Sequence, residues 1–118
     1  MAVNDLYELW KKETVGVEEL SRDLEGIDDS EIFDRFYREL DFGTAGLRGV
    51  LGAGTNRMNI FTVARASHGV AKYIIESKPE GSSVAIAYDS RNNSEAFAKT
   101  AACVLAANGI KVYLFDDL

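Results

Sequence analysis

A glycine-rich stretch that carries one arginine is the part of this sequence best suited to chemistry. It runs Phe42-Gly43-Thr44-Ala45-Gly46-Leu47-Arg48-Gly49, and five of the chain's ten glycines fall within twelve residues: Gly43, Gly46, Gly49, Gly52 and Gly54. Glycine lets a backbone approach a ligand closely, and the planar fork of an arginine matches the oxygens of a phosphate. The stretch is either a phosphate cradle with Arg48 as its charged donor or a tight connection between a helix and a strand.

Polar residues also follow two expected strands. Asp89-Ser90-Arg91 comes directly after the apolar run 84–88, and Asp116-Asp117 follows the run 110–115. Because ligands of open α/β sheets bind beyond the carboxyl ends of parallel strands, this edge is a second candidate site. Asp89 and Arg91 either contact a ligand there or orient a turn and pair with each other.

The spacing of apolar residues predicts the elements that would position both groups. Residues 59–77 have the period of an amphipathic helix, whereas 84–88 and 110–115 are short apolar runs typical of buried strands. Between these runs, Asn92 with Glu95 indicates a helix start and Gly109 indicates its end. A strand, a helix and a strand in this order form a βαβ unit with a parallel strand pair and a right-handed crossover.

Residues 1–41 are predicted to form a helical leader. We expect Asn4 to cap a first helix, Gly26 to end a second, and Asp28 with Glu31 to form a capping box at the start of a third. Helical spacing on the third helix predicts one apolar stripe, whose members we expect in the core: Ile32, Phe33, Phe36, Tyr37 and Leu40. We expect no chemistry in this leader, only packing against a sheet or a neighbouring domain.

Length and charge limit the classes of function. The 118 residues correspond to about one domain. The net charge of −6 arises in the leader, because residues 1–41 hold 13 acids and 5 bases, whereas residues 42–118 hold 6 acids and 8 bases. The bases are scattered rather than clustered on one face, which argues against nucleic-acid binding. A small anionic ligand remains compatible with the second segment.

The expected location is the cytoplasm. No apolar run is long enough to span a bilayer, and the N-terminus lacks the features of a signal peptide, so no membrane association is expected. The single cysteine, Cys103, cannot form an internal disulfide, and its apolar neighbours predict a buried core thiol. These features agree with a reducing compartment.

The only histidine lies beside a serine in Ala66-Ser67-His68-Gly69. Ser67 falls on the apolar stripe of the helix expected over 59–77, and His68 has no partner histidine or nucleophile with which to build a triad. We therefore expect a helix residue at each position rather than a nucleophile and its base.

The glycine-rich octapeptide resembles the first signature of the α-D-phosphohexomutases, the phosphoglucomutase/phosphomannomutase family. Two further segments resemble the family in the same order, Asn56-Arg57-Met58-Asn59 and the strand end Ala87-Tyr88-Asp89-Ser90-Arg91, followed by a helix and Val112-Tyr113-Leu114-Phe115. The resemblance runs from about Leu6 to Leu118. The helical leader is similar to that of longer members that act on phosphoglucose or phosphopentose.

The resemblance implies an enzyme of four domains, of which this chain would be the opening part. Such enzymes move a phosphoryl group between the 1- and 6-positions of a hexose phosphate through a phosphoserine and a bisphosphorylated sugar, with one Mg²⁺. Arg48 matches the family arginine that faces the phosphoserine and the bisphosphate. Thr44 and Gly46 match positions on the same turn, and Arg91 matches an arginine near the same edge.

The resemblance also implies a fold and its limits. The fold would be α/β, a three-layer α/β/α arrangement with a βαβ unit and a mixed sheet, in which residues 42–118 form an incomplete domain I after the leader. The chain stops at Leu118, before the family's phosphoserine loop, and the motifs for metal and sugar binding belong to later domains. The acids of this chain also lack partners at metal-ligand spacing. The hexose bisphosphate primer and Mg²⁺ would act in the parent enzyme, and the isolated chain would be inactive.

Two other hypotheses stay open. The chain could instead be a self-contained module that binds a phosphorylated ligand or assembles with a partner without catalysis. A nucleotide-binding fold is the weaker one, since no Gly-x-Gly-x-x-Gly follows a strand and no Walker lysine is present. In the fragment interpretation the last strand lacks its neighbour, and because unpaired strand edges invite pairing with another chain, self-association is expected.

Overall fold

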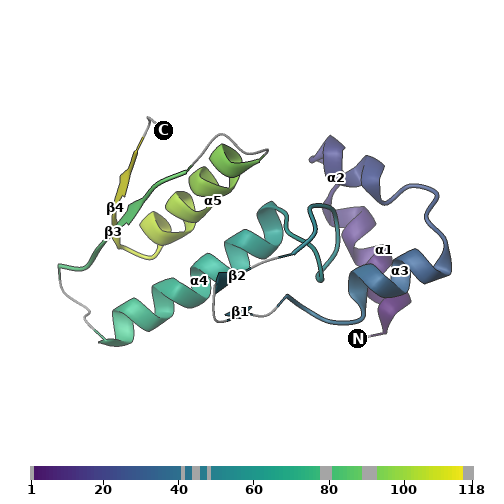
Figure 1. The fold of residues 1–118 in the computed structure, drawn as a ribbon, viewed down its shortest axis with the longest axis horizontal. Helices are drawn as coiled ribbons and strands as arrows, with labels where there is room; N and C mark the ends of the chain where they lie inside the picture. Colours follow the sequence, from purple (N-terminus) through teal and green to yellow (C-terminus); the bar gives the residue numbers. More distant parts are fainter. Residues whose placement is uncertain are drawn as a thin grey trace. The chain divides into compact units, whose positions relative to one another are not determined.

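A computed structural model describes residues 2–40, 42–43, 46–47, 49–77, 81–88 and 93–115 (Figure 1). The chain divides into two compact units, Met1–Asn59 and Ile60–Leu118, each with its own packing. In the described part, no helix is both long and apolar enough to cross a membrane. The predicted domain boundary between residues 41 and 42 is not tested by this division and stays a prediction.

The first unit begins with three helices, α1 (Val3–Glu13), α2 (Glu18–Asp23) and α3 (Asp29–Phe36). Their core centres on Phe36, which is 2% exposed. Its ring meets those of Tyr7 and Trp10 edge-on, with centroids 6.2 and 5.8 Å away, a favourable geometry for aromatic pairs. Leu20, Leu24 and Ile32 are buried in the same unit, so these helices have an apolar core of their own.

The predicted helix ends are correct in two places and wrong in one. The Asp28 side chain accepts a hydrogen bond from the Glu31 N–H at 2.9 Å and caps α3. Gly26 takes a left-handed φ of 66° just after α2, as its predicted role requires. Asn4 is not the cap of α1, because Ala2 already accepts from the Leu6 N–H and the helix begins at Val3.

The predicted apolar stripe of α3 is only partly buried. Ile32 and Phe36 are in the core, but Phe33 and Tyr37 are 57% and 46% exposed. Their rings stack on each other on the surface, with centroids 5.1 Å apart. A helix of two turns can turn only part of its circumference to its neighbours, so spacing alone assigned too wide a face to the core.

A short hairpin follows the leader. Strand β1 (Phe42–Gly43) pairs antiparallel with β2 (Gly46–Leu47), with Phe42 opposite Leu47 and Gly43 opposite Gly46. After β2 the chain enters a loop that ends the first unit at Asn59. Within this loop an isolated bridge joins Leu51 and Met58.

The second unit confirms the βαβ prediction. Helix α4 (Ile60–Ser77) leads to strand β3 (Ser83–Ile86), helix α5 (Ser94–Ala107) and strand β4 (Lys111–Leu114). Strands β3 and β4 pair in parallel, with Val84 opposite Val112 and Ile86 opposite Leu114. The described strands thus form two separate two-stranded sheets. The α/β class is confirmed, but a single mixed sheet is not what these strands form.

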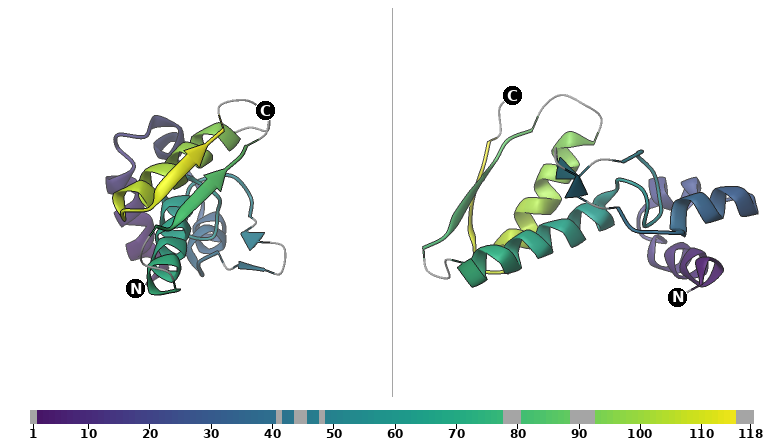
Figure 2. Two further views of the ribbon diagram at one scale, coloured as in Figure 1. Left: turned by 90° about the vertical axis from the view of Figure 1, so that its left-hand side faces the viewer. Right: turned by 60° about the horizontal axis from the view of Figure 1, so that its bottom comes forward.

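Helices α4 and α5 pack on each other, and both lie on the same side of the β3–β4 pair (Figure 2). The core between them consists of Ala71, Leu105 and Ile110, with Ile74, Val84, Ile86 and Val112 packed around it. On the opposite face of the strand pair, Tyr113 and Phe115 are 50% and 55% exposed. Two of the three expected layers are therefore present among the described residues, and the third stays a prediction.

Two details of α5 differ from the sequence expectation. Cys103 is exposed rather than buried, because it lies two residues, or about 200° of helical rotation, from the buried Leu105. The residue before α5 is Asn93, in a left-handed conformation and without a side-chain cap. The expected cap, Asn92, lies outside the described residues. Gly109 ends the helix with a φ of 82°, as predicted.

Candidate functional site

The structure describes only part of the predicted phosphate turn. Gly46 opens strand β2 and pairs with Gly43 of β1. Thr44, Arg48 and Arg91 lie outside the described residues, so their roles stay predictions. Residues 44 and 45, between the paired Gly43 and Gly46, also lie outside the described residues.

The second candidate site, at the carboxyl ends of the parallel strands, is described up to its border. The Phe115 N–H donates to the Ile86 carbonyl at 3.0 Å, so the two strands end side by side. The polar residues that follow them, Asp89, Ser90, Asp116 and Asp117, lie outside the described residues. The topology agrees with a common edge, but which of its side chains approach one another stays a prediction.

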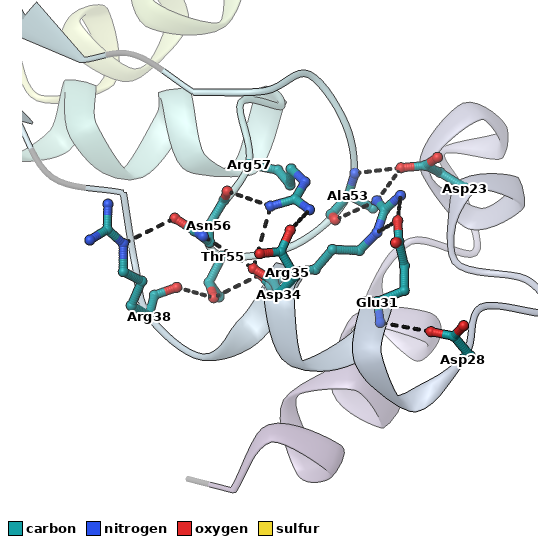
Figure 3. Close-up of polar contacts among 10 residues, drawn as sticks. All are labelled: Asp23, Asp28, Glu31, Asp34, Arg35, Arg38, Ala53, Thr55, Asn56 and Arg57. Atoms are coloured by element: carbon teal, nitrogen blue, oxygen red, sulfur yellow. Dashed lines mark hydrogen bonds and ion pairs between the residues drawn. The ribbon is translucent and has the colours of Figure 1, made fainter.

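The loop after the hairpin is held by a polar cluster that no sequence pattern predicted (Figure 3). Arg35 of α3 forms ion pairs with Asp23 of α2 and with Glu31, and it donates to the Ala53 carbonyl at 2.9 Å. The Ala53 N–H donates in turn to the Asp23 carboxylate at 2.8 Å. Arg35 and Asp23 therefore bind both backbone groups of one loop residue.

A second group of contacts joins the same helix to the end of the loop. Arg57 forms an ion pair with Asp34 and is 8% exposed. Asn56 donates through its backbone N–H to the Arg35 carbonyl at 2.9 Å. The Thr55 hydroxyl donates to the Arg38 carbonyl at 2.8 Å. Figure 3 shows these contacts along α3 and the residues that follow it.

The glycines of the loop permit this close approach. A Cβ on Gly52 would lie 2.9 Å from the Asp23 carboxylate, and one on Gly54 would lie 2.7 Å from the Arg35 carbonyl. Both glycines also have positive φ, at 149° and 131°. Two of the five clustered glycines thus fit a packing role against the leader, a role that their sequence spacing did not distinguish from a ligand cradle.

Asn59 completes the loop from inside. Its side-chain amide donates to the carbonyls of Gly52 and Gly54, at 2.8 and 3.1 Å, and the residue is 2% exposed. The segment 56–59, which carried part of the family resemblance, therefore holds the loop together in this structure.

The charges of the Arg35 cluster stabilise one another. Burial acts to raise the pKa of the Asp23 carboxyl, but hydrogen bonds from Arg35 and the Ala53 N–H, together with the charges of Arg35 and Arg57, hold that pKa below its ordinary value. Burial likewise acts to lower the pKa of Arg35, and its bonds to Asp23 and Glu31 raise that pKa overall. Asp23 and Arg35 are therefore both ionised at neutral pH.

Ser67 and His68, which were predicted to be helix residues without a catalytic role, both lie in α4. Ser67 is 8% exposed within α4. His68 lies at the surface, where its Nδ1 is 3.3 Å from the Asn108 side-chain amide of α5. Within the described ranges, no group of three or more His, Cys, Asp or Glu side chains could hold a metal ion.

This chain is similar to known proteins over most of its length. Residues 39–118 match the family model described as phosphoglucomutase/phosphomannomutase, alpha/beta/alpha domain I. The matched range includes the hairpin, its turn and the βαβ unit. No solved structure matches the chain significantly.

Individual relatives carry related names. A probable phosphoribomutase of Schizosaccharomyces pombe is 36% identical over 98% of this chain, and a phosphoglucomutase of Staphylococcus haemolyticus is 44% identical over 69% of it. A human phosphopentomutase is 32% identical over 92% of the chain. These relatives are much longer, since the chain spans 20%, 15% and 19% of their respective lengths.

Proposed function

The chain belongs to the phosphoglucomutase/phosphomannomutase family, with a match to its domain I over residues 39–118, and we propose that it is the N-terminal part of a sugar-phosphate mutase. The whole enzyme would transfer a phosphoryl group between the 1- and 6-positions of a hexose phosphate through a phosphoserine and a bisphosphorylated sugar. The family match carries this proposal because it covers the glycine-rich segment that contains Thr44, Gly46 and Arg48.

In this proposal Arg48 acts by electrostatics. Phosphoryl transfer depends mostly on positioning and on stabilising the charge that spreads over the phosphoryl oxygens, and a fixed cationic donor is well suited to that task. Thr44 and Gly46 would contribute to the same turn. Arg91 would bind phosphate from the edge beyond strand β3. Asp89, on the same segment, would orient the Arg91 side chain.

Mg²⁺ belongs to the proposal only for the whole enzyme. The acids of this chain lack suitable ligand spacing in the sequence, and the described residues hold no metal cluster. In this proposal the ion would be bound by other domains of the whole enzyme. A cytoplasmic location, where sugar phosphates are available, is part of the same proposal.

A coupled mutase assay tests the proposal. We expect no turnover of glucose 1-phosphate by the isolated chain, and turnover by the longer protein that contains it, with a trace of hexose bisphosphate as primer. Arg48→Ala in the longer protein should lower kcat/KM by at least about 100-fold, the usual effect of removing one donor to a transition-state oxyanion. Arg22→Ala, which removes an exposed guanidinium of α2, is the matched control and should leave turnover unchanged.

The same assay separates hexose from pentose substrates. The relatives' names include both phosphoglucomutase and phosphopentomutase. Comparing kcat/KM for glucose 1-phosphate and ribose 1-phosphate would assign the preferred sugar. Turnover by the isolated chain that is lost in Ser67→Ala would contradict the proposal, since it would place a phosphoryl acceptor in this chain.

The exposed face of the second unit supports the self-association that the fragment interpretation predicts. Tyr113 and Phe115 are half exposed on the face of β3–β4 away from the helices, and among the described strands β3 pairs only with β4. We therefore also propose that the isolated chain self-associates through this sheet. Light scattering should give a dimer mass that returns to the monomer in Tyr113→Ser. A monomer at high concentration would contradict self-association and leave the mutase proposal intact.

A further inference from the structure

The hairpin that carries the predicted phosphate turn is attached at both ends to one loop. Before β1, the Leu40 N–H donates to the Thr55 carbonyl at 3.1 Å. After β2, the Met58 N–H donates to the Val50 carbonyl at 2.8 Å, and the Gly52 N–H donates to the Met58 carbonyl at 3.1 Å. The backbone of residues 52–58 therefore binds Leu40 and Val50, described residues on either side of the hairpin.

That loop is attached to the leader through one buried residue. Ala53 is fully buried, and its carbonyl and N–H are bound by Arg35 and Asp23 respectively. The side chain of Arg35 is 11% exposed. The Asp23 side chain is half-buried, 37% exposed. A backbone segment whose N–H and carbonyl are both bound by an ion pair with a buried arginine has little freedom to shift, because a shift would leave polar groups without partners.

We propose that Arg35 is a positioning residue, which with Asp23 fixes the 52–58 loop and through it the place of the β1–β2 hairpin. The importance of this placement for phosphate chemistry rests on the proposed function, whereas the anchoring itself does not. The helical leader is then more than a packing element, since its second and third helices supply the two charged groups of the anchor.

The chemistry of the cluster requires arginine at this position. Arg35 bonds Asp23 and Ala53 through Nη1 and Glu31 through Nε and Nη2. A guanidinium presents these donors in a fixed plane, whereas the single ammonium of a lysine cannot reach all three acceptors with the same geometry. Arg35→Lys therefore keeps the positive charge and loses the hydrogen-bond geometry, so this variant distinguishes the positioning of the loop from charge balance alone.

Amide hydrogen exchange on the 118-residue chain tests the anchoring directly. The amides of Leu40 and Met58 join the loop to residues on either side of the hairpin, and the Gly52 amide closes the loop on itself. In Arg35→Met we expect each to exchange at least about tenfold faster, while amides of α1 change less than about twofold. Arg22→Met, an arginine of the same unit in an exposed ion pair, is the matched control and should change none of them.

The conservative variant distinguishes positioning from a purely structural role. Arg35→Lys should keep most of the thermal midpoint of the wild-type chain and still show fast exchange at Leu40, Gly52 and Met58. Restoration of both midpoint and slow exchange in Arg35→Lys would overturn the proposal, because charge alone would then suffice. Loss of both together, with exchange raised uniformly over the unit, would also overturn it.

A separate measurement links the anchor to catalysis. In the longer mutase, Arg35→Lys should lower kcat about tenfold to 100-fold, with a smaller change in KM, because displacement of a reacting group by about 1 Å costs that much. If the longer protein with its natural residues shows no mutase activity, the proposed function fails and the exchange result still decides the anchoring. If it is active and Arg35→Lys leaves kcat unchanged despite fast exchange, the hairpin is anchored as proposed and its catalytic importance is overturned.

Discussion

Different kinds of interaction are prominent inside each of the two units of this chain. In Met1–Asn59, the buried arginines Arg35 and Arg57 pair with carboxylates and bond the loop backbone. In Ile60–Leu118, the core cluster of Ala71, Leu105 and Ile110 is apolar, and the ion pair of Lys99 with Glu95 lies at the surface. The first unit thus adds directional polar contacts to its apolar core around Phe36, whereas the core cluster of the second unit is held by apolar packing.

The difference matters for what each unit can specify. Apolar packing tolerates small displacements, because the attraction depends mainly on buried area. Hydrogen bonds between charged groups and backbone depend on distance and angle, and a misplaced buried partner is costly. The loop that carries the hairpin is thus held by the interactions that specify position most narrowly.

The largest expected effect comes from the apolar unit. Leu105→Ala should lower the free energy of unfolding by about 3 kcal/mol, because it opens a cavity at a residue that is 3% exposed. Urea unfolding followed by far-UV circular dichroism would measure it. Cys103→Ala on the exposed side of the same helix should change the free energy by less than about 0.5 kcal/mol. Equal effects would mean that α5 does not pack as described.

A smaller loss is expected where the loop of the first unit meets α3. Gly54→Ala should destabilise by about 2 kcal/mol, because its φ of 131° disfavours a side chain and the new Cβ would lie 2.7 Å from the Arg35 carbonyl. Fluorescence of Trp10, whose ring contacts Phe36 in this unit, reports the transition. Gly69→Ala, in an open position on helix α4, should instead stabilise by up to about 1 kcal/mol. A neutral Gly54→Ala would argue against the close approach.

The pH dependence of stability should identify the Asp23 carboxylate. Its pKa is lower in the folded chain than in the unfolded chain, so its contribution is complete above the unfolded value, about 3.9, and is lost as the pH falls through the folded value. Asp23→Asn should therefore show a shallower acid loss of stability than the wild-type chain. Glu25→Gln, an exposed neighbour, is the control and should keep the wild-type slope. Parallel curves for the wild-type and Asp23→Asn chains would contradict the ionised anchor.

The smallest effect is predicted for an ion pair outside the anchor. Arg22 and Glu18 form an i,i+4 pair with side chains 73% and 74% exposed. Exposed pairs of this kind contribute little, so Arg22→Met should change the free energy of unfolding by about 0.3 kcal/mol. Urea unfolding at low and high salt would measure it. A loss comparable to that of Gly54→Ala would contradict the expectation that exposed ion pairs stabilise the fold less than buried ones.

Local patterns predicted the elements well and the surfaces less well. Sequence patterns predicted the cap at Asp28, the helix ends marked by Gly26 and Gly109, and the parallel strand pair, because each depends on residues close in sequence. The exposure of Phe33 and Cys103 was not predicted. Periodicity shows that a helix has an apolar face, but not how much of that face a neighbouring element covers. Of the predicted site, the family resemblance of the glycine-rich turn is confirmed by the comparison over residues 39–118, and the roles of Thr44, Arg48 and Arg91 stay predictions.

The sequence by itself determined the helices of the leader, the βαβ unit and the family, because these depend on local spacing and on short motifs. Only the tertiary structure decided what Gly52, Gly54 and Arg35 do. Asp23 and Ala53 are 30 residues apart and Arg35 and Ala53 are 18 apart, and no local rule pairs a helix arginine with a distant loop carbonyl. The contact exists because buried charges and buried backbone groups must find partners wherever the fold brings them together.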